Sequence, residues 1–516
     1  MSGLPVSFVL LGITAVAFAV HRYTKRRHYK LPPGPKGIPF FGNTFQVPKS
    51  NEWVQYAKWG KEYNTDLLYL DFMGTPAVIV QSAQAAYDLF EKRSSLYSCR
   101  AVGIMVNELL GWRFNIVFMQ YGDRWRDTRR AFHQWYNSGQ VPKYHGRVVK
   151  YSRKMLGQLL ETPDDFMAHL RHMTGSLIMR LTYGIDVKDE NDPYIHTAEN
   201  ALKSIAAAGN ANSQLVDWLP FLQHLPSWLP GLGFKRYADK LRPWVDAMNE
   251  NPHNAVKEAL TKGTANNSML TMLLERMEEK GENPENEDIY RDAAGTAYTG
   301  GADTTVSALG TFILGMVMNP DVQKKAQDEI DRVIGRDRLP EFEDEESLPY
   351  VSAVVKEAMR WQQVTPLAVP HRLTQDDEYM GYTLPAGTIV IGNAWAILHD
   401  ERRYPQPHRF WPERFLTADG KLNPDAPDPL EAAFGFGRRI CPGRAMAMAD
   451  VWFTAVSILS TFTISKPLDA NGNPITPKIA YTAGLLSYPE PYKADFKPRF
   501  AGVEKLIRVA NDASAE

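Results

Sequence analysis

A cysteine in a glycine-rich loop is the residue of this chain best placed for chemistry. Cys441 lies in the run F-G-F-G-R-R-I-C-P-G from Phe434 to Gly443, directly before an apolar helical pattern that starts at Arg444. At a helix N-terminus, unpaired backbone N–H groups and the helix dipole favour thiolate over thiol. Gly435 and neighbouring glycines would let a flat group approach the backbone. The loop therefore predicts an anionic sulfur ligand; a buried structural cysteine is the plain alternative.

The spacing F-x-x-G-x-R-x-C-x-G in this loop resembles the haem-binding signature of the cytochrome P450 superfamily, and every fixed position matches. The resemblance implies haem b, iron protoporphyrin IX, with the Cys441 thiolate as axial ligand of the iron. A thiolate ligand pushes electron density onto the iron and favours O–O cleavage. The same resemblance implies cofactor contacts from the other positions of the loop, namely Phe434, Gly435, Arg439 and Gly443.

A second motif, G-G-A-D-T-T from Gly300, lies inside a helical pattern that runs from Asp288 to Met318. Glycine in a helix interior costs about 1 kcal/mol relative to alanine, so helix propensity does not explain the pair of glycines. We expect Gly301 and Ala302 to make room for a flat cofactor, and Thr304 to bond back to a carbonyl one turn earlier. The run resembles the oxygen-activation motif of the family, which implies that Asp303 and Thr304 deliver protons. A kinked packing helix is the alternative.

Two further motifs would hold the cofactor and its loop. Glu357 and Arg360, three apart on a predicted helix, can pair, although surface ion pairs of this spacing are common. The family resemblance implies that Arg414, in F-W-P-E-R-F, joins them in a structural network. It also implies that Trp125 and Arg129 of a W-x-x-x-R element contact a haem propionate, for which a surface helix is the alternative. The other propionate partners that it implies are Arg372 and Arg439.

The substrate contacts implied by the family topology are apolar or small, which predicts a lipophilic substrate held mainly by shape. It would come from secondary metabolism or be a xenobiotic. Each position could equally belong to the core. The loop from Trp218 to Pro230 is expected either to dip into a membrane or to pack ordinarily. The candidate substrate contacts are Val102, Met105, Ala297, Val364, Leu367 and Leu485.

The N-terminus predicts a membrane anchor. An uncharged apolar stretch from Leu4 to Val20 is at the short limit for spanning a bilayer, and five basic residues follow it. By the positive-inside rule this keeps the remainder of the chain cytosolic; a cleaved signal peptide ending near Ala19 is the alternative. We expect a transmembrane anchor at 1–21 in the endoplasmic-reticulum membrane, a basic and proline-rich hinge at 22–38, and a cytosolic catalytic domain at 39–516.

Composition and periodicity predict one large domain, mainly α with small β-sheets, preceded by one transmembrane helix. The family resemblance implies that this domain has the cytochrome P450 fold. The 516 residues carry a formal net charge of −1 and two cysteines, which argues against nucleic-acid binding and against a disulfide-built ectodomain. Expected helices cover 51–63, 82–92, 288–318, 348–362 and 444–462, and expected strands cover 67–72 and 77–81.

The function that these motifs imply is a haem-thiolate monooxygenase resembling fungal members of the O-methylsterigmatocystin oxidoreductase group. The sequence shows no glycine-rich nucleotide-binding motif, so electrons must come from another protein. The resemblance implies NADPH–cytochrome P450 reductase, with cytochrome b5 as a second donor. A basic face of Arg124, Arg126 and Arg130, with Arg438 and Arg444, would suit an acidic donor. Alternatives are a haem-thiolate isomerase, dehydratase or peroxygenase, a gas-binding haem protein and, more remotely, a cysteine hydrolase.

Overall fold

The computed structural model describes residues 29–208 and 215–515, and the chain within them forms two compact units. The first unit contains the described part of 1–101, with 367–397 and 435–439; the second contains the remainder. The sequence predicts one large domain because no linker divides the chain. The boundary between the two units is not marked by a linker in the sequence, because the chain enters the first unit three separate times. The predicted anchor at 1–21 and the basic part of the hinge lie outside the described residues.

The first unit is built on a five-stranded sheet with the strand order β1-β2-β7-β4-β3. β1 (Leu67–Phe72) and β2 (Thr75–Val80) form an antiparallel hairpin, and β7 runs parallel to β2. The proline-rich part of the hinge lies along this sheet, because the Tyr69 amide donates to the Pro33 carbonyl at 2.9 Å. The other elements are α2 (Glu52–Glu62), α3 (Ala83–Ala86), α4 (Ser94–Tyr97), β3 (Cys99–Arg100), β4 (His371–Arg372), β5 (Asp377–Tyr379), β6 (Tyr382–Leu384), β7 (Ile389–Gly392) and α15 (Ala394–Leu398).

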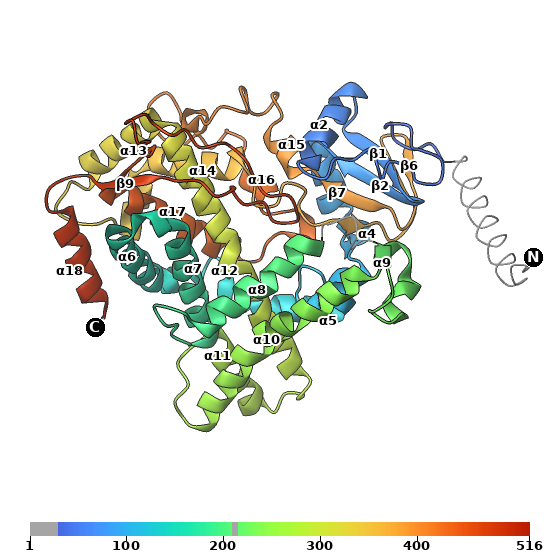
Figure 1. The fold of residues 1–516 in the computed structure, drawn as a ribbon, viewed down its shortest axis with the longest axis horizontal. Helices are drawn as coiled ribbons and strands as arrows, with labels where there is room; N and C mark the ends of the chain where they lie inside the picture. The colour runs from blue at the N-terminus through green and yellow to red at the C-terminus, as the bar shows by residue number, and fades with distance from the viewer. Residues whose placement is uncertain (1–28, 209–214, 516) are drawn as a thin grey trace, which may run out of the picture. The chain divides into compact units, whose positions relative to one another are not determined.

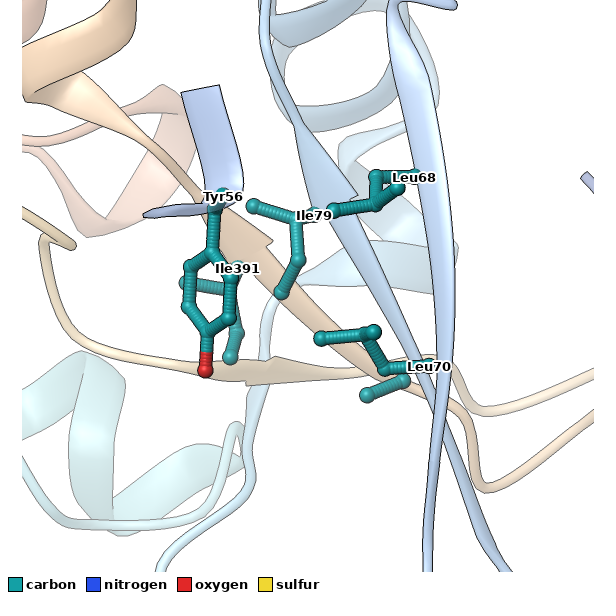
Figure 2. Close-up of a cluster of buried hydrophobic side chains, with 6 residues drawn as sticks. Tyr56, Leu68, Leu70, Ile79 and Ile391 are labelled. Atoms are coloured by element: carbon teal, nitrogen blue, oxygen red, sulfur yellow. The ribbon is translucent and has the colours of Figure 1, made fainter. Parts of the chain in front are cut away.

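The core of the first unit forms because alternate residues of the strands point to one face of the sheet. Figure 2 shows Leu68 and Leu70 of β1, Ile79 of β2 and Ile391 of β7 gathered around Tyr56 of α2. Leu68, Leu70 and Ile79 are fully buried. Helix α2 is therefore fixed to the sheet by its apolar face, and the sheet holds the segments that carry β3 and β4.

The second unit is helical, and its longest helix, α12 (Asn286–Met318), lies against several others, including α5, α7 and α17 (Figure 1). Its other elements are α5 (Asp123–Tyr136), α6 (His145–Glu161), α7 (Phe166–Tyr183), α8 (Pro193–Ala208), α9 (Leu215–Trp218), α10 (Gly233–Thr261), α11 (Met269–Lys280), α13 (Pro320–Val333), α14 (Pro349–Trp361), α16 (Leu430–Ala433), α17 (Arg444–Thr461), β8 (Phe462–Ser465), β9 (Asp495–Pro498) and α18 (Val503–Ala515).

The element predictions are largely confirmed. Strand β1 has the predicted bounds, and α2, α12, α14 and α17 differ from prediction by one or two residues at their ends. Ser82 caps α3 as expected, with its hydroxyl accepting from the Ala85 amide at 3.3 Å. Within the described residues, α12 is the one helix long and apolar enough to cross a membrane. Most of it is buried inside the protein, as expected of a core helix.

Candidate active site

The cysteine loop is held by its own backbone. The Cys441 amide donates to the Phe434 carbonyl at 2.9 Å, and α17 begins three residues later at Arg444. Gly435 has φ 77°, which L-residues with side chains rarely adopt, so a tight loop requires glycine here. Both cysteines of the chain are free thiols. The backbone thus fixes an unbridged sulfur just ahead of a helix N-terminus.

The free thiol does not behave as the sequence predicts. Burial raises the pKa of Cys441, and this outweighs the backbone N–H of Gly443 and the cations Arg129 and Arg444, which favour the anion. The expected thiolate therefore does not follow from the helix N-terminus alone, because desolvation of the sulfur is the larger effect. A metal ion would reverse the balance, since a coordinating thiol is deprotonated outright.

Arg129 lies beside this loop. Its guanidinium donates to the Ile440 carbonyl at 2.8 Å and lies 5.4 Å from the ring centroid of Trp125, one turn earlier on α5. Burial lowers the pKa of Arg129, while the neighbouring Cys441 raises it. The sequence prediction that Trp125 and Arg129 share a helical face is confirmed. A half-buried cation next to a half-buried sulfur is an arrangement that a bound anion would stabilise.

Within the first unit, residues 435–439 pack against Phe90. Phe436 stacks on Phe90 with centroids 5.2 Å apart, and Gly437 has φ 58° with no room for a Cβ beside the Phe90 carbonyl. Gly437 is therefore explained by packing, without any cofactor. Arg439 is buried and donates to the Ser98 carbonyl at 2.8 Å, whereas Arg372 is exposed on β4.

The glycine motif in α12 places its two glycines on different faces. The Thr304 hydroxyl donates to the Gly300 carbonyl at 2.5 Å, which confirms the predicted bond one turn back. A Cβ on Gly300 would meet open space, whereas a Cβ on Gly301 would lie 2.8 Å from carbons of Ile178 in α7. Gly301 is thus explained by the close approach of two helices. The open position on the Thr304 face is Gly300, because residues four apart share a helix face.

Asp303 is held by two side chains from distant segments. Its Oδ2 accepts a hydrogen bond from the Tyr488 hydroxyl at 2.6 Å, and its Oδ1 lies 3.5 Å from Nε of Arg171 in α7. Asp303, Arg171 and Glu199 of α8 line a small cavity beside α12. The Tyr488 contact was not foreseen from the sequence, since 185 residues separate the two side chains.

The predicted network around Glu357 is present and buried. Arg360 donates to both carboxylate oxygens of Glu357 at 2.8 and 2.9 Å, and Arg414 pairs with the same carboxylate at 3.2 Å. Arg360 also donates to the Leu398 carbonyl at 2.8 Å, and the Trp411 amide donates to Glu357 at 2.8 Å. These contacts join α14 to the segment 398–414 and leave little of the buried charge unsatisfied.

The expected substrate segments converge in part. The Ser487 amide donates to the Val364 carbonyl at 2.8 Å, and the Ser307 hydroxyl of α12 donates to the Ser487 carbonyl at 2.6 Å. This brings the segments of Val364 and Leu485 to α12, one turn beyond Thr304. The remaining candidates are Met105 and Ala297, both buried, Val102, half-buried, and Leu367, which packs against the core of the first unit.

The basic face expected on α5 is partly neutralised. Arg124 pairs with Asp292 at 2.5 Å, Arg130 pairs with Asp127 at 2.7 Å, and Arg126 pairs with Asp123. Because each of these three arginines has an acidic partner, their attraction for an acidic electron donor is weaker than predicted.

The geometry fits a haem-thiolate protein, and comparison with known proteins agrees. The cytochrome P450 family model matches residues 32–496. The chain is 41% identical to tryptamine 4-monooxygenase of Psilocybe cyanescens, over 97% of this chain and 99% of that protein. It is 42% identical to cytochrome P450 monooxygenase ple1 of Rhodocybe pseudopiperita (98% and 96% covered). It is 40% identical to cytochrome P450 monooxygenase 98 of Postia placenta (97% and 96%).

The chain therefore belongs to the cytochrome P450 family, and it is a haem-thiolate monooxygenase. Members of this family bind haem through a cysteine thiolate and act on lipophilic substrates with dioxygen and a redox partner; eukaryotic members are typically membrane-associated. The prediction of a fungal-type cytochrome P450 is confirmed by fungal relatives that are 41% and 42% identical to this chain. The residues fit the cofactor, because Cys441 offers one unbridged sulfur with a backbone N–H and a cation next to it.

Proposed function

We propose that Cys441 is the axial ligand of haem b and that the enzyme inserts one oxygen atom into a lipophilic substrate, with electrons from NADPH. The observation that carries the assignment is the environment of Cys441. A half-buried free thiol receives a backbone N–H from Gly443 and lies near the Arg129 guanidinium. When bound, the haem supplies oxygen activation, and the thiolate ligand favours O–O cleavage.

The residues of α12 would then manage protons. The Thr304 hydroxyl is held one turn back on the Gly300 carbonyl, and Asp303 follows on the side of Arg171 and Tyr488. We assign Thr304 to holding a proton donor at the cofactor and Asp303 to exchanging protons with solvent. Support comes from the half-buried position of both side chains. The open Gly300 fits the space-making role better than the predicted Gly301.

Arginines would bind the haem propionates, since a guanidinium forms strong charge-assisted hydrogen bonds with a carboxylate. The assignment of Arg129 to a propionate is supported by its position beside the cysteine loop, with Trp125 packed on it. Arg439 and Arg372 are proposed from the sequence motifs alone. In the loop itself, Phe434, Gly435 and Gly443 would shape the seat of the porphyrin around Cys441.

The substrate would be a lipophilic small molecule bound near α12. Support comes from the convergence of the Val364 and Leu485 segments on that helix through Ser307 and Ser487. Met105, Val102 and Ala297 would complete the apolar wall. One relative is named for tryptamine as its substrate, which makes indole amines a first group to screen by the spin-state change of the iron.

The electron donor would be NADPH–cytochrome P450 reductase, with cytochrome b5 as a second donor, and the enzyme would be anchored in the endoplasmic-reticulum membrane. Support comes from the apolar stretch Leu4–Val20 with basic residues after it. For the proposed electron donor, the support is limited to the arginines of α5, which are partly paired with acids. Electron transfer should slow moderately with added salt, as expected for a surface with few unpaired charges.

A carbon-monoxide difference spectrum of the reduced full-length protein tests the proposal. The wild-type protein should show the red-shifted Soret band of a thiolate-ligated haem, and Cys441→Ser should abolish it. Cys99→Ser is the matched control and should keep the band, because Cys99 lies in β3 of the first unit. A colourless wild-type protein made with ample haem, or a normal band in Cys441→Ser, would contradict the assignment.

A further inference from the structure

The carboxylate of Asp303 is held differently at its two oxygens. Oδ2 accepts from the Tyr488 hydroxyl at 2.6 Å. Oδ1 is buried, accepts no hydrogen bond from the described residues, and lies 3.5 Å from Nε of Arg171. Asp303 and Arg171 both line the small cavity beside α12. Arg171 lies 3.7 Å from Glu199, whose side chain is 39% exposed, so this side of Asp303 leads toward solvent.

Tyr488 is itself fixed by the backbone around it. Its amide donates to the Thr482 hydroxyl at 3.0 Å, and its carbonyl accepts from the Thr482 amide at 2.8 Å. The preceding Ser487 is bound on both sides, by Val364 and by Ser307 of α12. Burial and then the neighbouring carboxylate raise the pKa of Tyr488, so the hydroxyl keeps its proton and acts as donor. The phenol therefore meets Asp303 from a rigid support.

We propose that Tyr488 is a positioning residue for proton delivery: its hydroxyl holds Oδ2 of Asp303 so that Oδ1 stays turned toward Arg171 and the cavity. The inference rests on the role proposed above for Asp303. Without the phenol hydroxyl, the carboxylate is free to rotate and to pair with Arg171 through both oxygens. A carboxylate held by a cation in this way is a poorer carrier of protons, because its charged form is stabilised.

The first experiment is a double-mutant cycle on the thermal unfolding of the haem-loaded full chain, with Tyr488→Phe, Asp303→Asn and the double variant. Loss of one hydrogen bond to a charged group should lower Tm by roughly 1–3 °C in a chain of this size. If the two side chains act on each other, Tyr488→Phe should lower Tm much less in the Asp303→Asn background. Fully additive Tm changes would overturn the proposal.

The second experiment measures NADPH oxidation and its solvent deuterium isotope effect in microsomes with the reductase and without added substrate. We expect Tyr488→Phe to slow oxidation by about tenfold, a part of the full effect of a general acid, and to raise the isotope effect. The double variant should be no slower than Asp303→Asn. Tyr481→Phe is the matched control, because Tyr481 hydrogen-bonds Thr311 of the same helix at 3.1 Å, and it should keep the normal rate.

The outcomes separate the inference from the proposed function. If Asp303→Asn is slow while Tyr488→Phe runs at the wild-type rate, the tyrosine is only structural and the inference is wrong, whereas Asp303 keeps its role. If Tyr481→Phe slows oxidation as much as Tyr488→Phe, the effect is one of packing, and the inference is again wrong. If Asp303→Asn also runs at the wild-type rate, both assignments are wrong, although a normal carbon-monoxide spectrum would leave Cys441 as the haem ligand.

Discussion

Arg360 donates hydrogen bonds to both carboxylate oxygens of Glu357, at 2.8 and 2.9 Å, and neither side chain is exposed to solvent. Breaking a buried pair by removing one charge leaves the other uncompensated and costs about 3–5 kcal/mol. Glu357→Gln should therefore unfold well below the wild-type temperature and lose haem with the fold. Asp328→Asn is the control, because its pair with Lys324 is mostly exposed and contributes at most about 0.5 kcal/mol. Equal melting temperatures for the two variants would contradict the structural role of Glu357.

The two neighbouring glycines of α12 should respond in opposite ways to alanine. Gly300 is exposed and a Cβ there meets nothing, so Gly300→Ala should stabilise the polypeptide by up to about 1 kcal/mol. Gly301→Ala drives a methyl into Ile178 and should cost about 1–3 kcal/mol. Thermal unfolding of both variants measures the difference.

The variant that stabilises the fold, Gly300→Ala, should be the one that impairs function. Because Gly300 shares a face with Thr304, its alanine variant should disturb oxygen use even though it folds well. The measurement is the ratio of hydrogen peroxide released to NADPH consumed, which should rise. A normal ratio in Gly300→Ala would show that the open face of α12 does not lie at the cofactor.

Arg129 and Arg130 are adjacent on α5 and give a matched pair for cofactor binding. Arg129 is half-buried against Trp125 and the Ile440 carbonyl, whereas Arg130 has 66% of its side chain exposed and pairs with Asp127. Arg129→Leu should lower the haem content per chain several-fold. Arg129→Lys should have a haem content between those of the wild type and Arg129→Leu, since lysine keeps the charge but not the forked donors. Arg130→Leu should bind haem normally. Equal losses from Arg129→Leu and Arg130→Leu would remove the case for a propionate contact.

Local patterns predicted much of this molecule. The bounds of β1, the long helix α12, the Thr304 bond to Gly300 and the pairing of Glu357 with Arg360 all depend on residues close in sequence. Such contacts follow from the period of a helix or strand and from side-chain chemistry alone. The same holds for Trp125 and Arg129, which are one turn apart.

The remaining features depend on which distant segments meet. Gly301 could not be told from Gly300 without knowing that Ile178 lies on one side of α12. Tyr488 comes from a stretch between β8 and β9 with no helical or strand period, so nothing local marks its contact with Asp303. The raised pKa of Cys441 likewise depends on burial, which the loop sequence does not reveal.

Asp450 gives a prediction for pH. Its carboxyl is buried in α17, with one hydrogen bond from the Thr454 hydroxyl at 3.4 Å, and burial raises its pKa from 3.8 to about 7. A folded-state pKa above the unfolded value means that the protonated form favours folding. This contribution is complete below the unfolded pKa and is lost as the pH rises through about 7.

The loss from Asp450 at alkaline pH can reach about 4 kcal/mol, because each unit of pKa difference is worth about 1.4 kcal/mol. Asp450→Asn removes the titration while keeping a polar side chain of similar size. The variant should melt close to the wild type at pH 5 and above it at pH 8, measured on haem-loaded protein at both values. Asp328→Asn should show no such crossing, since Asp328 is exposed. If Asp450→Asn melts below the wild type at pH 8, the buried carboxylate must be stabilised by a partner that outweighs its desolvation.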